Sequence, residues 1–342
     1  MPARFRRLLP GLAVSLAFTA WFVTGAEWAA VIDALGEVRP GWVVLSAAVL
    51  YTEFLIRTAR WGLLLRGLAP GARFGRLFVA TALGMGLNVV LPFRAGDLAR
   101  PWLGSRETGL GVAPLVTIAV MERVFDILGL VSVLLLMLVL LPAQPTAQGE
   151  LVANLKLYGG IVGAIGALGL TTFFVLAARE ATARALFTRL ATLAPPPVRD
   201  RALALFDGFA QGLACVRDTR AVLGAAALSF LHWFNGSLSI YVLYQAFGIA
   251  LPFSAACFTT VAIALTVALP QAPGFFGVFH VAIEKTLVLW GQPEAPAEAF
   301  AIVFWAVSFV PITLSALLLA WREGFRVETA RAAVEGERRD SA

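Results

Sequence analysis

Three charged residues interrupt the long apolar run 111–141: Glu122, Arg123 and Asp126. Their spacing of three and four residues makes them neighbours on one face of a helix. A charge deep in lipid costs at least about 2.5 kcal/mol, so such a residue faces a polar cavity or a partner of opposite sign. Two interpretations follow: an Arg123–Asp126 pair that holds helices together, or a set of side chains that lines a polar cavity.

A second polar group surrounds the sequence LPFRAG at 91–96. Asn88 precedes it, Arg94 lies within it, and Asp97 and Arg100 follow it. A guanidinium fixed in a bend can hold a phosphate through paired hydrogen bonds. The alternative is an interfacial arginine that reaches out to lipid headgroups. Asp97 and Arg100 are three residues apart and could simply pair with each other.

Glu53, Arg57 and Arg60 fall on one helical face, with Trp61 beside them. Arginine and tryptophan are typical of the belt at a membrane–water interface, and we assign Arg60, Trp61 and Arg66 to such a belt. Glu53 lies above this belt within apolar sequence, so the Glu53–Arg57 pair is a candidate for function.

The C-terminal half carries fewer polar candidates. Gln271 lies within the sequence LPQAPG at 269–274, and His280 follows it, while His232 interrupts the apolar run 221–247. A histidine inside a membrane can join helices by hydrogen bonds or carry protons. We expect the first role for His232. We expect proton transfer or substrate contact for His280, because it lies close to a broken helix.

The residues that metal sites and common catalytic motifs require are scarce. The 342 residues contain two histidines and two cysteines. No H-E-x-x-H helix, G-x-S-x-G elbow or phosphate-binding loop occurs in the sequence. Cys215 and Cys257 are too few and too far apart for a metal site or a disulfide framework. We therefore expect no metal, no cofactor, no nucleic acid partner and no enzymatic activity of a recognisable class.

The composition is that of a membrane protein. Hydrophobic residues make up 59% of the chain and charged residues 14%, whereas soluble domains carry roughly 25% charged residues. The mean hydropathy is +0.82. The net charge of +6 is carried almost entirely by arginine, since Lys156 and Lys285 are the only lysines. Arginine binds phosphate well, although genomic base composition explains the arginine excess equally well.

Two L-P-x-x-x-G sequences break the apolar runs. Proline removes a backbone donor and glycine permits positive φ, so either residue can end a helix. In lipid, a broken helix persists only where protein buries it or where it lines a cavity. Paired breaks in corresponding halves point to the binding site of a transporter. The residues that form the predicted breaks are Pro92, Gly96, Pro270, Pro273, Gly274 and Gly277.

The apolar runs predict an all-α, polytopic integral membrane protein with six membrane-spanning helices, since each run can cross a hydrocarbon core of roughly 30 Å. The predicted spans are 8–26, 41–65, 111–141, 157–178, 221–247 and 299–321. The segments 77–109 and 253–291 contain the breaks, and we interpret both as re-entrant helical hairpins. We treat 1–325 as a single transmembrane domain and 326–342 as a cytoplasmic tail.

Arginine is distributed unevenly among the predicted loops. The loops within 57–76 and 179–220 are rich in arginine, whereas those at 27–39 and 292–298 are mostly acidic. Basic loops remain in the cytoplasm. We therefore predict that both termini and the arginine-rich loops are cytoplasmic, and that 142–156 lies outside.

This topology gives the two halves opposite orientations. Each half, about 8–142 and 157–321, contains two spans, a hairpin and a third span, and the second half starts on the outside. The arrangement is an inverted repeat. The N-terminal run also resembles a signal peptide, but its length favours an uncleaved first helix.

Taken together, the polar motifs resemble those of the flippase-like membrane proteins related to the transmembrane region of lysylphosphatidylglycerol synthase. The shared patterns occur in order between about residues 40 and 320, and they are specific only jointly. They are Arg57-x-x-Arg60-Trp61, Asn88-x-x-Leu91-Pro92-x-Arg94-Ala95-Gly96-Asp97-x-x-Arg100, Glu122-Arg123-x-x-Asp126 and Leu269-Pro270-x-x-Pro273-Gly274-x-x-Gly277.

The resemblance implies an all-helical domain that moves or exposes lipids across the bacterial inner membrane. Many family members have Glu where this chain has Asp97, and many have Glu where it has His280. Any substrate or proton role of that second Glu is therefore lost here or passes to His280. The sequence contains no counterpart of the soluble aminoacyl-transferase domain of the synthase, so we expect no lysine transfer.

The resulting hypothesis is a lipid transporter or flippase that holds an anionic or zwitterionic headgroup between the hairpin tips. The candidate substrate-binding residues are Arg57, Asn88, Arg94, Asp97, Arg100, Glu122, Arg123, Asp126, Gln271 and His280. Uphill transport would require a partner protein or a proton or ion gradient, with His280, Glu122 or Asp126 as proton carriers.

Two alternatives remain open at this point. One is a membrane-embedded transferase or hydrolase that modifies lipids, and the other is a non-catalytic partner subunit of such an enzyme. Phospholipid, aminoacylated lipid, hopanoid and polyprenyl-linked sugar are all compatible substrates, and the sequence leaves the oligomeric state open.

Overall fold

The computed structural model describes residues 19–91, 96–140, 149–192, 195–268, 273–322 and 324. Within these residues every regular element is a helix, which confirms the predicted all-α class. A helical stretch at 19–25 is followed by α3 (Trp28–Gly36), α4 (Pro40–Leu65), α5 (Phe74–Val90), α6 (Gly96–Thr108), α7 (Val112–Leu140), α8 (Gly149–Ala178), α9 (Glu180–Ala191), α10 (Pro196–Leu213), η2 (Ala214–Arg217), α11 (Thr219–Ala246), α12 (Phe253–Val267), η3 (Pro273–Phe275), α13 (Val278–Leu289) and α14 (Glu294–Arg322).

Local sequence explains where the long helices begin. Pro40 occupies the first turn of α4, where a proline lacks only a donor that the helix leaves unpaired. Asp218 caps α11, because its carboxylate accepts hydrogen bonds from the backbone N–H groups of Arg220 and Ala221 at 2.9 and 3.3 Å. Both helices therefore start at residues that suit a helix N-terminus.

In the part of the chain that the structure describes, four helices are long and apolar enough to cross a membrane: α4, α7, α11 and α14. A fifth candidate is the pair formed by residues 164–178 of α8 and the following helix α9, which are bent by 90° relative to each other. The four helices correspond to the predicted spans 41–65, 111–141, 221–247 and 299–321, and α8 corresponds to 157–178. Most of the predicted first span, 8–26, lies outside the described residues.

The first L-P-x-x-x-G sequence coincides with a helix break. Leu91 is extended, with φ −96° and ψ 142°, as expected for a residue that precedes a proline. The chain resumes as a helix at Gly96, and α5 and α6 pack against each other as a hairpin. The break at Gly96 is thus confirmed, whereas Pro92 lies outside the described residues.

The second L-P-x-x-x-G sequence also breaks the chain between two helices that pack together, α12 and α13. Pro273 begins the short helix η3, and Gly274 and Gly277 have φ values of 79° and 83°. These values are readily adopted only by glycine, which explains why α12 does not continue into α13. The breaks at these three residues are confirmed, and Pro270 lies outside the described residues.

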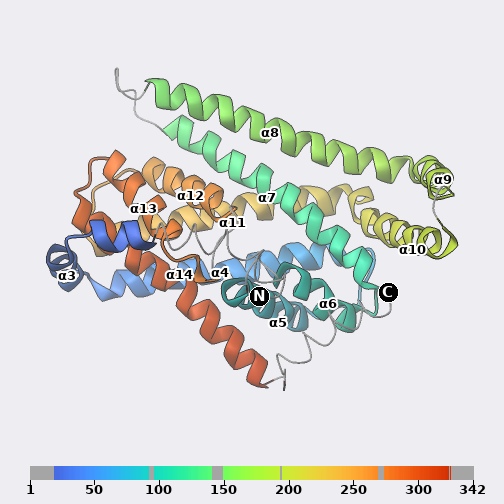
Figure 1. Ribbon diagram of the computed structural model, residues 1–342, viewed down its shortest axis with the longest axis horizontal. Coiled ribbons are helices and arrows are strands. Elements are labelled where there is room, and N and C mark those ends of the chain that lie inside the picture. The colour runs from blue at the N-terminus through green and yellow to red at the C-terminus, as the bar shows by residue number, and fades with distance from the viewer. Residues whose placement is uncertain are drawn as a thin grey trace.

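The two halves repeat one order of elements: a long helix, a hairpin and a second long helix (Figure 1). The opening helices α4 and α11 pack against each other, and each hairpin packs on the closing helix of the opposite half. Helix α5 contacts α14, and α12 contacts α7. The second arms stay within their own halves, because α6 contacts α7 and α13 contacts α14. Interchanging the halves leaves this pattern unchanged.

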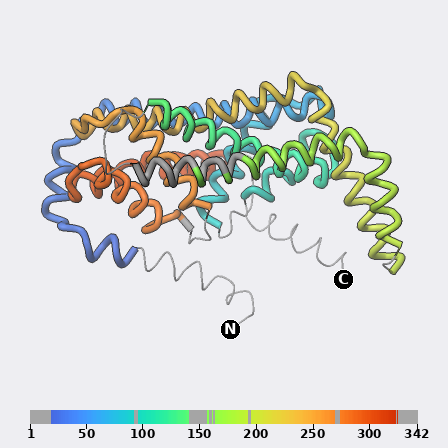
Figure 2. The backbone as a smooth tube through the Cα atoms, turned by 90° about the horizontal axis from the view of Figure 1, so that it is seen from above, coloured from blue at the N-terminus to red at the C-terminus, as the bar shows by residue number. Residues whose placement is uncertain are grey.

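Short helices lie at both ends of the molecule. Helices α3 and α13 lie at one end of the long axis, and α9 and α10 lie at the opposite end (Figures 1 and 2). Helices α9 and α10 are joined by an ion pair between Arg184 and Asp207, whose Nε and Oδ1 atoms are 2.9 Å apart. The long helices thus run between two caps of short helices.

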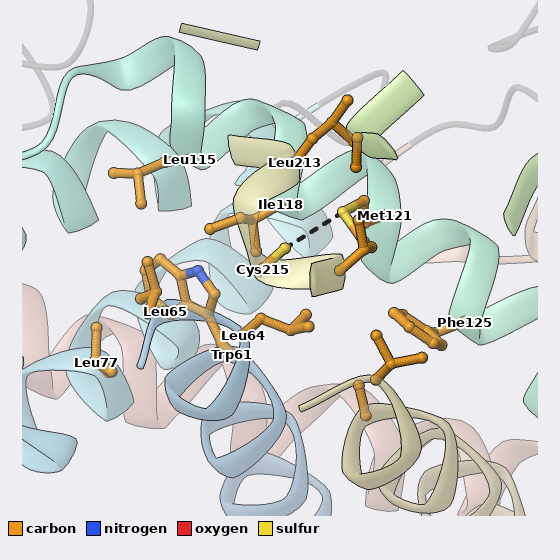
Figure 3. Packing of buried hydrophobic residues seen from close by; sticks show 14 of the residues in the cluster. Trp61, Leu64, Leu65, Leu77, Leu115, Ile118, Met121, Phe125, Leu213 and Cys215 are labelled. Carbon is orange, nitrogen blue, oxygen red and sulfur yellow. Dashed lines mark hydrogen bonds between the residues drawn. The ribbon is translucent and has the colours of Figure 1, made fainter. Parts of the chain in front are cut away.

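Two large apolar clusters fill the interior, and they differ in their side chains. The first apolar cluster comprises Trp61, Leu64, Leu65, Leu77, Leu115, Ile118, Met121, Phe125, Leu213 and Cys215 with several smaller residues (Figure 3). The second is richer in aromatic rings and includes Tyr244, Phe275, Phe279, Phe300 and Phe304. Trp61, Met121 and Phe125 of the first cluster directly follow or precede Arg60, Glu122 and Asp126 in the sequence.

Gly96 closes the first hairpin by backbone contact. A Cβ atom at this position would collide with the carbonyl oxygen of Gly84 and would lie 2.7 Å from the backbone nitrogen of Asn88. No side chain can be accommodated at that distance without separating α5 from α6. Glycine is therefore required here by the close approach of two helices.

We expect the substitution Gly96→Ala to lower the melting temperature of the purified protein in detergent, because the added methyl group must separate α5 from α6. Gly75→Ala is the matched control, since a Cβ atom there meets nothing within 4 Å and alanine is favoured over glycine in a helix by about 1 kcal/mol. Equal melting temperatures for the two variants would contradict the close approach.

Candidate functional site

A fully buried arginine joins three helices at the centre of the site. Arg60 of α4 donates from Nε to Oε1 of Glu122 at 3.3 Å and from Nη1 to Oδ1 of Asp126 at 2.5 Å. The same Nη1 donates to the hydroxyl of Ser229 on α11 at 2.7 Å. The Arg60 and Glu122 side chains are 1% and 0% exposed. Opposite charges therefore compensate one another within the protein interior, as buried charges require.

A second arginine reaches Glu122 from the first hairpin. Arg100 of α6 donates from Nη2 to Oε2 of Glu122, so each oxygen of this carboxylate is bound by a different arginine. The guanidinium carbon of Arg100 lies 4.9 Å from the ring centroid of Trp61, a cation–π distance. Glu122 thus ties α4, α6 and α7 together.

Arg123 is the most exposed arginine of the group. Its Nη1 atom lies 3.4 Å from Oδ2 of Asp126, and its side chain is 38% exposed. The short hydrogen bond of Asp126 goes to Arg60 instead, at 2.5 Å. The Arg123–Asp126 ion pair is therefore present, but Asp126 also pairs with Arg60, which makes the shorter contact.

Arg57 lies one turn along α4 from Arg60 and has its own partners. Its Nε donates to Oε1 of Glu53 at 2.7 Å, and its Nη2 lies 3.0 Å from Nε2 of His232 on α11. Arginine has no acceptor, so this ring nitrogen must accept the hydrogen bond. His232 is therefore neutral, with its proton on Nδ1, which lies 3.7 Å from Oε1 of Glu53. The expectation that His232 bridges helices is confirmed.

These contacts belong to a longer row of polar pairs, which we call the polar seam, along the α4–α11 interface. From the Arg60 end it consists of Arg60–Ser229, Arg57–His232, Thr52–Asn235 and Ser46–Ser239. The last two pairs have separations of 3.0 and 2.9 Å. Residue numbers rise on α11 as they fall on α4, so the two helices are antiparallel.

Asn88 and Asp97 face each other across the first break. Asn88 Nδ2 donates to Oδ1 of Asp97 at 2.8 Å, and the Asp97 backbone N–H donates to Oδ1 of Asn88 at 3.1 Å. This reciprocal pair fixes the register of α5 against α6. Asp97 also interacts electrostatically with Arg57 and Arg100. The Asn88–Asp97 pair therefore lies near these two arginines.

We call these side chains together the charged cluster. Its members are Glu53, Arg57, Arg60, Asp97, Arg100, Glu122, Arg123, Asp126 and His232. Among the described residues it thus holds four arginines and four carboxylates, so the formal charges cancel when His232 is neutral. Of the predicted substrate-binding residues, Arg57, Asp97, Arg100, Glu122, Arg123 and Asp126 lie in the cluster, and Asn88 lies beside it.

The remaining predicted residues are placed elsewhere or lie outside the described part of the chain. His280 is fully buried among aromatic rings, with ring centroids of Phe276 and Phe22 at 4.4 and 4.9 Å. Among the described residues, neither of its ring nitrogens has a hydrogen-bond partner. Arg94 and Gln271 lie outside the described residues. A small apolar pocket between α8, α9 and α10 contains none of these residues.

The assignment of Arg60 and Trp61 to an interfacial belt is wrong. Both side chains are 1% exposed, and Arg60 makes the central ion pairs of the charged cluster. Arg66 is exposed, in agreement with the assignment. Sequence reasoning missed Arg60 and Ser229 as site residues. The available signal was that Arg60 shares a helical face with Glu53 and Arg57, which also lie in the cluster.

Comparison with known proteins places the chain in a family. Residues 8–316 match the model of the family described as the lysylphosphatidylglycerol synthase TM region. The chain belongs to this family. The resemblance seen in the polar motifs is thus confirmed. Together with the long apolar helices, membership of the lysylphosphatidylglycerol synthase TM-region family identifies a multi-pass membrane protein.

Three curated relatives, all archaeal, are similar to this family member. A UPF0104 membrane protein of Methanothermobacter thermautotrophicus is 23% identical over 80% of this chain and 81% of its own length. The UPF0104 membrane protein MJ1078 of Methanocaldococcus jannaschii is 25% identical, over 67% of this chain and 91% of its own. Glycosyltransferase AglD of Haloferax volcanii is 24% identical over 86% of this chain but over only 50% of its own length. No solved structure matches the chain.

We expect Arg60→Ala to destabilise the protein strongly, because it leaves two buried carboxylates short of a partner. Breaking a buried ion pair by removing one member typically costs about 3–5 kcal/mol. The measurement is thermal unfolding of the purified protein in detergent. Arg66→Ala, one and a half turns further along the chain and exposed, is the control. Unfolding of Arg60→Ala at the wild-type temperature would contradict the central role of Arg60.

Proposed function

We propose that the chain is a lipid transporter that binds an anionic or zwitterionic headgroup at the charged cluster and moves it between leaflets. The cluster carries this proposal, because four arginines and four carboxylates lie within otherwise apolar helices. Charges in such a position are rare in membrane proteins and mark substrate or ion pathways. Arginine is also the side chain best suited to bidentate binding of a phosphate.

In this proposal the arginines of the cluster have two different roles. Arg60 and Arg100 are buried and bound to carboxylates, so in our proposal they hold the site together. Arg57 and Arg123 are 15% and 38% exposed and would contact the headgroup, joined by Arg94 from the first break. Asn88 and Asp97 would keep the hairpin closed beside them. Gln271 and His280 of the second hairpin would shape the other side of the path.

We further propose the inverted-repeat arrangement of six spans with two re-entrant hairpins. Three observations support it. The opening helices α4 and α11 are antiparallel, the hairpins pack on the closing helices of opposite halves, and α5 contacts η3 at the second break. Broken helices that face each other in this way are where transporters of inverted-repeat design bind their substrates. The acyl chains would remain in the surrounding lipid.

The orientation that we propose follows from the arginines. The end of the molecule with α9 and α10 carries Arg184, Arg189, Arg199 and Arg201, so it and both termini would lie in the cytoplasm. Helices α3 and α13 would then lie on the outer side. The membrane in question would be the cytoplasmic membrane of a prokaryote, a bacterial one by our expectation, although the three curated relatives are archaeal.

Cysteine labelling in intact cells tests this topology. We expect Glu294→Cys to react with a membrane-impermeant maleimide from outside, and Glu107→Cys to react only after permeabilisation. The native thiols give little background: Cys257 is buried, and burial raises the pKa of the Cys215 thiol to about 12, which keeps it in the unreactive form. Labelling of both introduced residues from the same side would contradict the inverted repeat.

Reconstitution tests the lipid function itself. In liposomes containing the purified protein, we expect fluorescent phosphatidylglycerol to cross between leaflets. We expect Arg123→Gln to slow this by about ten-fold, since one charge-assisted hydrogen bond contributes about 1.5–3 kcal/mol. Arg106→Gln is the matched control, because the guanidinium carbon of Arg106 lies 4.1 Å from the ring centroid of Trp102 and Arg106 is not a member of the charged cluster. A wild-type protein that moves no lipid, or an unimpaired Arg123→Gln variant, would refute the proposal.

One observation favours a second candidate function. The match to AglD, which is named a glycosyltransferase, covers only half of that protein, so domains of this kind also occur within larger enzymes. The chain could accordingly serve as a non-catalytic partner that positions a lipid-modifying enzyme, or could modify lipids itself. Partner function predicts that Arg123→Gln leaves activity intact while the complex still assembles. Lipid turnover by the purified chain, abolished by Glu122→Gln, would instead indicate an enzyme.

A further inference from the structure

One carboxylate of the charged cluster, Glu53, has fewer arginine partners among the described residues than Glu122 and Asp126 have. Glu122 and Asp126 each contact two arginines, and the Asp97 side chain accepts a hydrogen bond from Asn88. Within the described part of the chain Glu53 has one arginine partner, Arg57, which also donates to the neutral ring of His232. Its side chain is 16% exposed, whereas that of Glu122 is 0% exposed. Glu53 is therefore better placed than Glu122 or Asp126 to exchange its partner.

Arg57 is fixed in position independently of Glu53. Its Nη2 donates to Nε2 of His232, while its Nε donates to Glu53. If Glu53 releases the Nε–H group, the bond to His232 still holds the guanidinium beside the α4–α11 interface. The freed N–H edge would then point where the carboxylate now lies, and a phosphate oxygen could replace the carboxylate oxygen.

The charges that act on Arg57 and His232, the two residues beside Glu53, come from four helices. They are Arg57 and Arg60 on α4, His232 on α11, Asp126 and Arg123 on α7, and Asp97 on α6. Helices α5 and α14, which also pack on α4, contribute no charged side chain to this set in the described residues. An anionic headgroup that entered this balanced cluster would add one negative charge. That charge requires compensation in a site largely shielded from water.

We propose that Glu53 takes up one proton when an anionic lipid headgroup displaces it from Arg57, so that lipid anion and proton move together. This inference rests on the proposed lipid transport, and it identifies the proton as the ion to which that transport is coupled. The proton comes from water and binds the Glu53 carboxylate, which then no longer competes for Arg57. The phosphate oxygen accepts the Arg57 Nε–H in its place. Loss of the proton restores the Glu53–Arg57 pair and releases the lipid.

This exchange has a distinctive stoichiometry. One negative charge and one proton enter together, so the cluster keeps its formal neutrality and the step moves no net charge. The proton is carried by Glu53, with the Nδ1–H group of His232 at 3.7 Å from its Oε1 atom. Glu122, Asp126 and His280, which the sequence suggested as carriers, have no part in it.

Calorimetric titration of the purified full-length chain with dioctanoyl-phosphatidylglycerol tests the proposal between about pH 5 and pH 8. Repeating the titration in buffers of different ionisation enthalpy counts the protons taken up. We expect one proton per lipid bound. Where Glu53 is ionised in the free protein, we expect the affinity to fall about ten-fold per pH unit, the slope for one linked proton.

Glu53→Gln imitates the protonated carboxyl permanently. We expect this variant to bind the lipid tightly at every pH and to take up no proton, whereas the exposed control Glu37→Gln should match the wild type. Binding without proton uptake in the wild type would overturn the proposal, and so would unchanged proton uptake in Glu53→Gln. The wild-type proton count decides the matter even if the variant fails to fold.

The transport assay separates this inference from the function on which it rests. A wild-type protein that moves phosphatidylglycerol in liposomes but binds it without a proton contradicts only the proton coupling. A wild-type protein that neither binds nor moves the lipid contradicts the proposed function and this inference with it.

Discussion

The fold depends on one buried carboxylate, Glu122, and on the two arginines that share it. Arg60 reaches it from α4 and Arg100 reaches it from α6, so three separate elements must meet at one point. Burial of apolar surface has no direction, and within lipid it provides little force between helices. A buried charge is different, because leaving it unpaired is very unfavourable. Glu122 therefore determines how far the first hairpin reaches along α7.

The polar seam applies the same constraint over a longer distance. Its pairs recur along α4 and α11 from Arg60–Ser229 to Ser46–Ser239. A shift of either helix by one residue would mismatch every pair, since hydrogen bonds require specific distances and directions. The charged cluster thus rests on an interface whose register is set by polar contacts, and the apolar clusters fill the space on either side.

Sequence reasoning succeeded where the cause is local. The breaks follow from proline and glycine, and the functional interest of Glu122 and Asp126 follows from a charge within an apolar run. It failed for Arg60, because an interfacial arginine and a buried one can have the same local sequence. The helical face that Arg60 shares with Glu53 and Arg57 is a weak signal, and the contact between Arg60 and Glu122, 62 residues apart in the sequence, decides the matter. Most of the first predicted span, together with Arg94 and Gln271, lies outside the described residues, and these parts of the hypothesis stay predictions.

The unequal interiors of the two halves have a consequence for the resting state. In an inverted repeat, the inward-open and outward-open conformations arise when the halves exchange their internal arrangements, and identical halves would populate both equally. Here one half is joined by ion pairs and the other by stacked aromatic rings such as Phe279 and Phe304. Under the proposed arrangement the two conformations therefore differ in free energy. Without lipid, a transporter of this kind would populate mainly one of the two conformations. Binding of the lipid would supply the free energy that shifts the equilibrium toward the other.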